Sequence, residues 1–411
     1  MSEASAPAAG WVCPFCALAC HHLQVQVGAD NEPLALQGGD CARARRGLQH
    51  FVGRSAPASP TIDGLNATLD EAIATAAQHL AASRQPLFAG LGADVAGARA
   101  LYPLACACGA ICDGAGGDAA MHTLRALQDR GQFTTTLAEV RTRAELIVFV
   151  GAVPDDIAPL IRERCGIGEP QVPQRQVVVL GGTGAADVPL QGDLFDTLGL
   201  LCALLGERHV DATPPLQALA QQLRAARYAV LIGTPPTLPA HGALLIEAVH
   251  RIVGELNRTT RAAALWIGGG NGSATVNQVF AWLSGLPLRS RAGPRGLEHE
   301  PLAFDATRLL AEGSVDALLW SASFDAQSLP PPSPVPLVLL GHPALAGQCR
   351  RPGLRSVFIP VATPGIGCDG HLFRTDGTVL MPLHAVRRDS LPTLAAAAGA
   401  ILQALGARRP S

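Results

Sequence analysis

The chain has 411 residues, of which 48% are hydrophobic and 16% are charged, and its formal net charge is −2 at pH 7. This composition is typical of a globular protein of about two or three domains, and it excludes disordered, collagen-like and coiled-coil chains. All 31 basic residues are arginine. Because lysine is absent from the sequence, a Walker phosphate-binding loop, Schiff-base chemistry and a lysine general base are excluded as well.

Neither a nucleic acid nor a membrane is expected as a partner. The arginines are spread along the chain, and the densest cluster, Arg43 to Arg46, is too small for a nucleic-acid-binding surface. Residues Met1 to Trp11 lack the basic and apolar regions of a signal peptide, and no uncharged stretch reaches the roughly 18 apolar residues that cross a bilayer. We therefore expect a cytoplasmic protein. In that reducing compartment the 11 cysteines are interpreted as metal ligands, reactive thiols or buried hydrophobes rather than as disulfides.

Four cysteines within residues 1–55 predict a small metal-binding module. Cys13, Cys16, Cys20 and Cys41 follow the pattern C-x2-C-x3-C-x20-C. Four thiolates at this spacing suit either a [4Fe-4S] cluster or a tetrahedral zinc ion. A structural zinc ribbon usually pairs two close C-x2-C knuckles, whereas the second half of this module supplies one cysteine, so iron and sulfur are favoured. A zinc site and four unrelated thiols remain the alternatives.

Behind this module, short apolar runs alternate with alanine- and leucine-rich stretches, which is the pattern of βα units with a buried parallel sheet. A capping box formed by Thr68 and Glu71 predicts a helix that ends at about Ser83, and residues 394–405 predict a terminal helix. The proline-rich residues 330–336 predict a stiff extended connector. The predicted strands are Pro86 to Gly90, Leu146 to Gly151, Gln176 to Gly181, Tyr228 to Gly233, Ala262 to Gly268, Ala317 to Trp320, Leu337 to Gly341 and Val357 to Pro360.

So many strands exceed what one open sheet usually needs, and two α/β domains are therefore predicted behind the module. We expect a discontinuous domain of residues 56–140 and 300–411, and another of residues 141–299. A ligand is expected at the loops that follow the strands, because open parallel sheets bind ligands at the carboxyl ends of their strands. The glycine run 268–273 in such a loop could cradle a phosphate, or it is a tight strand-to-helix turn.

The other cysteines and histidines predict no second metal site. Cys106, Cys108 and Cys112 lie where a helix is expected to run into a strand, and we interpret them as packing residues rather than ligands. His21 and His22 could compete for the metal of the module, but they are interpreted as residues at its edge. No H-x-H, H-E-x-x-H or G-x-S-x-G motif occurs, so a metal-hydrolase or serine-hydrolase centre lacks its usual parts. The isolated cysteines are Cys165, Cys202, Cys349 and Cys368.

An ordered set of motifs covers nearly the whole chain. It consists of Trp11 to Cys16 with Cys20 and Cys41; Gly109 to Asp113; Leu127 and Gln128; Leu137 to Val140; Ala144 to Leu146; Gly268 to Asn271; Asn277 to Val279 with Trp282, Gly285 and Pro287; and Gly367, Gly370, Arg374, Asp376 and Gly377. In this order the motifs resemble the B subunit of formylmethanofuran dehydrogenase, of the molybdopterin or tungstopterin oxidoreductase type. The resemblance implies the fold of those enzymes, in which a small cysteine-cluster module precedes two Rossmann-like α/β domains.

The same resemblance indicates that the metal ligand is missing. In this family a cysteine or selenocysteine, followed by a histidine, serves the molybdenum or tungsten site. An ungapped match places Ala119 and Ala120 at those positions, and alanine offers neither a soft donor nor a proton-transfer group. Cys112 and His122 could replace them only in a shifted alignment, and we prefer the ungapped match.

Two further positions bear on the pterin site. The family's Gly-x-Asn-Pro loop corresponds to residues 151–154, where Val153 replaces the asparagine and cannot form its hydrogen bonds. Arg295 matches the family's arginine near the site, although a surface or salt-bridge role explains it equally well. We therefore expect no bound molybdopterin or tungstopterin, and no catalytic residue on this chain.

A relative without a redox centre is also known, namely the B-type component of the formyltransferase/hydrolase complex of bacteria that oxidise formaldehyde with a methanopterin-type carrier. The resemblance implies partners of the A, C and D types, of which A hydrolyses formyl-methanofuran and D transfers the formyl group. We predict a B-type scaffold subunit of such a complex, with a [4Fe-4S] cluster on its four N-terminal cysteines. The alternatives are an active formylmethanofuran dehydrogenase subunit with a molybdenum or tungsten pterin, and a free-standing zinc protein.

Overall fold

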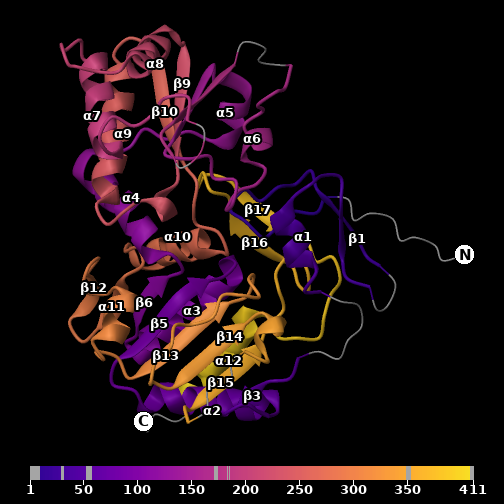
Figure 1. Ribbon diagram of the computed structural model, residues 1–411. Helices are drawn as coiled ribbons and strands as arrows, with labels where there is room; N and C mark the ends of the chain where they lie inside the picture. Colours follow the sequence, from indigo (N-terminus) through magenta and orange to yellow (C-terminus); the bar gives the residue numbers. More distant parts are fainter. Residues whose placement is uncertain are drawn as a thin grey trace, which may run out of the picture. The chain divides into compact units, whose positions relative to one another are not determined.

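The computed structural model describes residues 10–28, 32–51, 58–170, 175–182, 184, 186–348 and 353–407, so that Cys349 lies outside the described residues. The chain is a mixed α/β protein with two compact units, both discontinuous in sequence (Figure 1). Unit 1 comprises Met1–Gly117, Gly269–Arg374 and Leu380–Ser411, and unit 2 comprises Asp118–Gly268 and Thr375–Val379. Within the described residues, no helix is both long and apolar enough to cross a membrane.

Unit 1 is built on a nine-stranded sheet. Its five central strands, β6, β5, β13, β14 and β15, are parallel, and antiparallel strands extend it at both edges. Because helices and loops cover both faces, the central strands consist of almost uninterrupted apolar residues. In spatial order the strands are β12 (Gly296–His299), β11 (Ser290–Gly293), β6 (Ile111–Gly114), β5 (Pro86–Gly92), β13 (Ala317–Ala322), β14 (Leu337–Gly341), β15 (Ser356–Pro360), β3 (Thr61–Ile62) and β4 (Leu65–Asn66).

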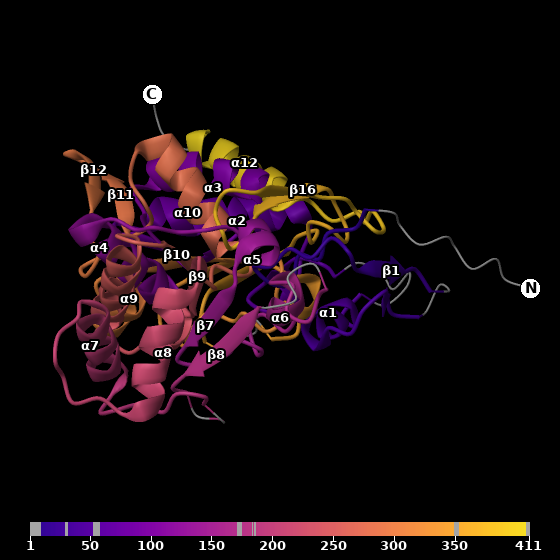
Figure 2. The same cartoon turned by 90° about the horizontal axis from the view of Figure 1, so that it is seen from above.

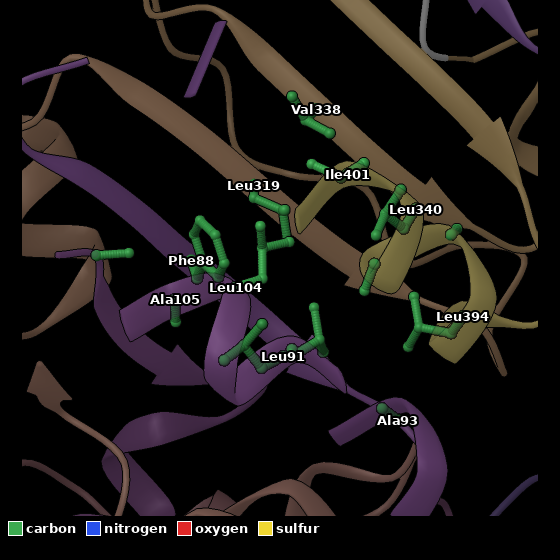
Figure 3. Packing of buried hydrophobic residues seen from close by; sticks show 14 of the residues in the cluster. Phe88, Leu91, Ala93, Leu104, Ala105, Leu319, Val338, Leu340, Leu394 and Ile401 are labelled. Atoms are coloured by element: carbon green, nitrogen blue, oxygen red, sulfur yellow. The ribbon is translucent and has the colours of Figure 1, made fainter. Parts of the chain in front are cut away.

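Helices α3 and α12 pack on one face of this sheet and close its main core (Figure 3). In that core, Leu104 from α3 and Ile401 from α12 lie over Phe88 and Leu340 of the strands. The helices of unit 1 are α1 (Ala42–Leu48), α2 (Leu69–Ala82), α3 (Val95–Cys108), α10 (Ser273–Ser284), α11 (Ala306–Ala311) and α12 (Leu394–Gly406). Two small antiparallel sheets complete the unit, β1 (Gln24–Gln26) with β2 (Ala35–Gln37), and β16 (Gly370–Phe373) with β17 (Leu380–Leu383).

Local sequence signals explain where these helices begin and end. Thr68 and Glu71 form the predicted capping box, and Ser83 is the C-cap of α2. Asp94 caps the start of α3 by accepting hydrogen bonds from two backbone N–H groups, and Gly109 ends the helix in the left-handed conformation that glycine adopts without strain. These caps fix the point at which the chain leaves α3 and enters β6.

Unit 2 contains a four-stranded parallel sheet in the order β10-β9-β7-β8. Helices α7, α8 and α9 lie together and share one apolar core with the sheet (Figure 2). The segment 375–379 returns to this unit, where the Thr375 hydroxyl donates to Trp266 O at 2.8 Å. The elements are α4 (Gly117–Arg130), α5 (Leu137–Arg143), β7 (Leu146–Val150), α6 (Ile161–Arg164), β8 (Gln176–Leu180), α7 (Leu194–Leu205), α8 (Pro214–Ala225), β9 (Tyr228–Gly233), α9 (Gly242–Leu256) and β10 (Arg261–Trp266).

All eight strands predicted from apolar runs are present, four in each of the two large sheets. The terminal helix is also present, and residues 330–336 contain no regular secondary structure. The compact units differ from the expected domains in four places: the N-terminal module belongs to unit 1, residues 118–140 and residues 375–379 belong to unit 2, and residues 269–299 belong to unit 1. The last difference arises because β11 pairs with β6, which adds the β11–β12 hairpin to the large sheet.

Candidate functional site

The four N-terminal cysteines gather in one buried place in unit 1. None of the four is in a disulfide, and each has at most 7% of its surface exposed. The loop that carries Cys13, Cys16 and Cys20 folds back on itself, because Cys13 N donates to Cys20 O at 2.8 Å. Cys41 arrives from the next loop as the N-cap of α1, where its sulfur accepts a hydrogen bond from Ala44 N at 3.5 Å. The predicted set of thiols is therefore brought together by the fold.

These thiols influence one another electrostatically. Burial raises the pKa of Cys13 well above its usual value, and the charges of the other three thiolates raise it further. Burial also raises the pKa of Cys16, while a backbone N–H group and the Arg43 guanidinium act in the opposite direction. Burial and the neighbouring thiols thus favour the protonated form of Cys13 and Cys16.

The structure places four buried thiols of the cysteine module in one neighbourhood. In the described part of the chain, no group of three or more histidine, cysteine, aspartate or glutamate side chains is arranged to hold a metal ion. His21 is exposed and His22 half-buried, and their rings lie 6.4 Å apart.

The module lies at the carboxyl edge of the large sheet. Trp11 Nε1 donates to Gly365 O at 3.0 Å, beyond the end of β15, and Val12 and Ala19 pack against Phe324, beyond the end of β13. Arg43 of α1 donates through Nε to Phe15 O at 2.5 Å. The edge of a parallel sheet at which ligands usually bind is thus covered by the cysteine loops.

The glycine run that could cradle a phosphate is packed against the end of β5. A Cβ atom on Gly272, whose φ is +79°, would lie 2.5 Å from Ala93 O, and one on Gly92 would lie 2.3 Å from Asn271 O. The Asn271 side chain donates to Asp325 at 2.9 Å and accepts from Arg43 at 3.5 Å. Close backbone packing therefore explains these glycines as a tight strand-to-helix turn.

The two positions at which the family has its metal-ligating cysteine and the following histidine are alanines in this chain. Ala119 and Ala120 lie in α4 and are half-buried. Thr123 donates from its hydroxyl to Ala119 O at 3.0 Å, which is an ordinary helical contact. Cys112 faces the main core of unit 1, and His122 lies against Gly242 in unit 2.

The next feature is the pair of positions that the resemblance assigned to the pterin site, Val153 and Arg295. Val153 is half-buried in the loop after β7 and brings no polar side-chain atom. Arg295 lies in the β11–β12 turn with 88% of its side chain exposed, and its ion pair with Glu298 spans 3.6 Å. Arg295 therefore lies at the surface and forms an ion pair there.

A buried ionic centre in unit 1 was not anticipated from the sequence. Arg289 donates to Asp113 at 3.3 Å and to Asp305 at 2.5 Å, and it adopts a left-handed φ of +62°. Burial raises the pKa of Asp113, and the Arg289 charge opposes that shift. The resemblance had drawn attention to Asp113, but no periodic pattern identifies an arginine that reaches it across 176 residues of sequence.

Comparison with known proteins then decides the family. No family model matches the chain. It is 33% identical over 327 residues to the B subunit of the formyltransferase/hydrolase complex Fhc of Methylorubrum extorquens, and the match covers 76% of this chain and 87% of that protein. The chain belongs to the family of Fhc B subunits. Like the sequence motifs, this relationship extends over most of the chain.

Other similar proteins agree with membership of this family. A chain in the crystal structure of the FhcABCD complex from Methylorubrum extorquens, with methylofuran, superimposes with a TM-score of 0.74 at 30% identity, over 85% of this chain and 99% of that chain. The B subunits of tungsten-containing formylmethanofuran dehydrogenase 2 from Methanocaldococcus jannaschii and Methanococcus maripaludis are 26% and 23% identical. Each of these matches covers 89% of this chain and 91% of the relative.

Proposed function

We propose that this chain is the B-type subunit of a formyltransferase/hydrolase complex and that it holds subunits of the A, C and D types together. The observation that carries the proposal is the likeness to a chain of the FhcABCD complex over 99% of that chain's length. The complex would act on formyl groups carried by a methylofuran-like compound and serve one-carbon metabolism through a methanopterin-type carrier. The chain would keep the fold of a molybdopterin oxidoreductase without its reaction.

The residues of this chain do not fit a molybdenum or tungsten centre held by a protein thiolate. Ala119 and Ala120 supply neither a sulfur ligand nor an acid or base, and Val153 supplies no hydrogen bond. Cys112 is not assigned the role of the missing ligand, because it lies in β6, seven residues before Ala119 along the chain, and the ungapped match does not place it there. No catalytic step is therefore assigned to this chain.

The residues do fit a [4Fe-4S] cluster. Such a cluster takes each of its four thiolates on a different iron, so the thiols need to share a site but not to converge on one ion. Cys13, Cys16, Cys20 and Cys41 share one buried neighbourhood and would supply these four thiolates. When bound, the cluster would supply one-electron transfer. Arg43 would offset part of the negative charge of the thiolates.

Co-expression with candidate A-, C- and D-type proteins tests the proposal. We expect a tag on this chain to retain all three partners through size-exclusion chromatography, in fixed proportion and without molybdenum or tungsten. A chain that elutes alone would overturn the scaffold role. Stoichiometric molybdenum or tungsten, together with formate-dependent dye reduction, would instead identify an active formylmethanofuran dehydrogenase subunit.

A further inference from the structure

A second group of thiols in unit 1 lies outside the cysteine module. Cys106 and Cys108 end helix α3, and Cys112 lies in the next strand, β6. Cys106 and Cys112 line the same small pocket, which lies between α3, α10 and the β11–β12 hairpin, whereas Cys108 does not line it. The turn at Gly109 is the local reason for this arrangement, since it returns the chain from the helix to the sheet directly beside Cys106.

The pocket combines two soft sulfur donors with mostly apolar walls, which include Phe280 and Leu297. Its lining contains no carboxylate or imidazole, so its oxygen donors are neutral hydroxyl and carbonyl groups. Its one charged lining residue, Arg291, already donates to Glu298 and to Gln85 at 2.6 Å each. Calcium, magnesium and manganese sites usually include carboxylate ligands, which this lining does not supply.

The two thiols face one pocket, Cys106 from the end of α3 and Cys112 from β6. Burial raises the pKa of Cys112, and the charges of Cys106, Asp113 and, least of the three, Cys108 raise it further. Tyr102 and Ser284 of α10 line the same pocket as Cys106. Cys106 is half-buried and Cys112 is 3% exposed, so the pair is reached from the Cys106 side.

We propose that Cys106 and Cys112 form a two-thiolate binding site for a soft monovalent metal ion, of which Cu(I) is the best match. This site is independent of the proposed scaffold function. Zinc would require further ligands, and in the described residues no group of three or more donor side chains surrounds a point. Cu(I) accepts two thiolate sulfurs as a complete ligand set and prefers them to oxygen. On binding, two S–H bonds lose their protons to solvent, two Cu–S bonds form, and copper keeps its charge.

An anaerobic Cu(I) titration of the full chain, with bathocuproine disulfonate as the competing chelator, tests this site. The four thiols of the cysteine module are present in every variant and can bind Cu(I) as well, so the number of Cu(I) equivalents bound is compared with that of the wild type. We expect Cys106→Ser and Cys112→Ser each to bind one Cu(I) equivalent fewer than the wild type. The double variant loses the same single equivalent, because both thiols hold one ion.

The matched control is Cys108→Ser, which removes a neighbouring thiol outside the pocket and is expected to bind as much Cu(I) as the wild type. The X-ray absorption spectrum of the Cu(I)-loaded wild type, after subtraction of the spectrum of Cu(I)-loaded Cys106→Ser, should show a copper ion with two sulfur neighbours and no nitrogen or oxygen. Unchanged stoichiometry in Cys106→Ser would overturn the proposal, as would the loss of two equivalents in the double variant. If Cys112→Ser does not fold, the half-buried Cys106→Ser variant decides the question by itself.

Discussion

Two buried polar centres of unit 1 differ in how their groups are satisfied. Around Arg289, the guanidinium donates to Asp113, Asp305 and the Pro301 carbonyl, so the protein itself supplies the partners of this charge. In the cysteine module, burial raises the pKa of Cys13 and Cys16, and the charges of the other three thiolates raise the pKa of Cys13 further. The comparison teaches that a network of paired charges stabilises the fold by itself, whereas buried thiols that oppose one another's ionisation are suited to a cation, whose charge would favour the thiolates.

The largest effect is expected from breaking the donor set. Cys13→Ser removes one of the four cluster ligands, and we expect the anaerobically purified variant to lose its iron and the broad visible absorption of an iron–sulfur protein. The matched control is Cys202→Ser, which removes a half-buried thiol in unit 2 and should leave both unchanged. An equal iron content in the two variants would contradict the proposal that Cys13 is a ligand of an iron–sulfur cluster.

Breaking the ionic network around Arg289 should destabilise the protein and leave its iron content unchanged. Arg289→Met leaves the Asp113 and Asp305 carboxylates buried without their cation, which costs about 3–5 kcal/mol in the free energy of unfolding. The control, Arg308→Met, breaks an ion pair with Glu312 whose partners are about half exposed, and its cost should stay below roughly 1 kcal/mol. Chemical denaturation measures both. If the two variants prove equally stable, the Arg289 network is not structural.

Acidity should act at the boundary between the cysteine module and the sheet. His342 follows β14 and its ring lies 4.9 Å from that of Phe51, and burial, with a smaller contribution from His50, lowers its pKa to about 4. Because the folded pKa is below the unfolded value of about 6.5, stability is complete above pH 6.5 and is lost as the pH falls towards 4, by about 2 kcal/mol between pH 7 and pH 5. His342→Asn should flatten this slope when the free energy of unfolding is measured by chemical denaturation between pH 7 and pH 5, and an unchanged slope would contradict the prediction.

The smallest effect concerns the attachment of the module to the sheet edge. Trp11→Phe removes the hydrogen bond from Nε1 to the buried Gly365 carbonyl and should cost about 1–2 kcal/mol. The same change at Trp282, which is 59% exposed, should cost a few tenths of a kcal/mol at most. Thermal unfolding of the two variants checks the difference. Equal melting temperatures would show that Trp11 does not anchor the module.

The sequence predicted the parts of the fold that repeat a local pattern. Strands such as β9 and β14 are continuous apolar runs, and the α2 cap is a two-residue signal, so both were recognisable. The β11–β12 hairpin was missed because it is short, half-exposed and stabilised by a pairing with β6 that is distant in sequence. The placement of residues 269–299 in unit 1 depended on that pairing.

The candidate site was predictable to a similar extent. The spacing of the cysteines identified a common site, and the ordered motifs identified the family that the comparisons then showed. Arg289 could not be found in this way, because its role depends on two carboxylates that only the folded chain brings to it. The position of the cysteine module at the carboxyl edge of the sheet likewise depends on contacts such as that of Trp11 with Gly365.

The central claim is that this subunit keeps a cluster site but has lost the metal-pterin site. Elemental analysis of the anaerobically purified complex tests it most directly. We predict about four iron atoms for each copy of this chain, with neither molybdenum nor tungsten in stoichiometric amount. A complex that contains one molybdenum or tungsten atom per chain, or one zinc in place of iron, would contradict the account.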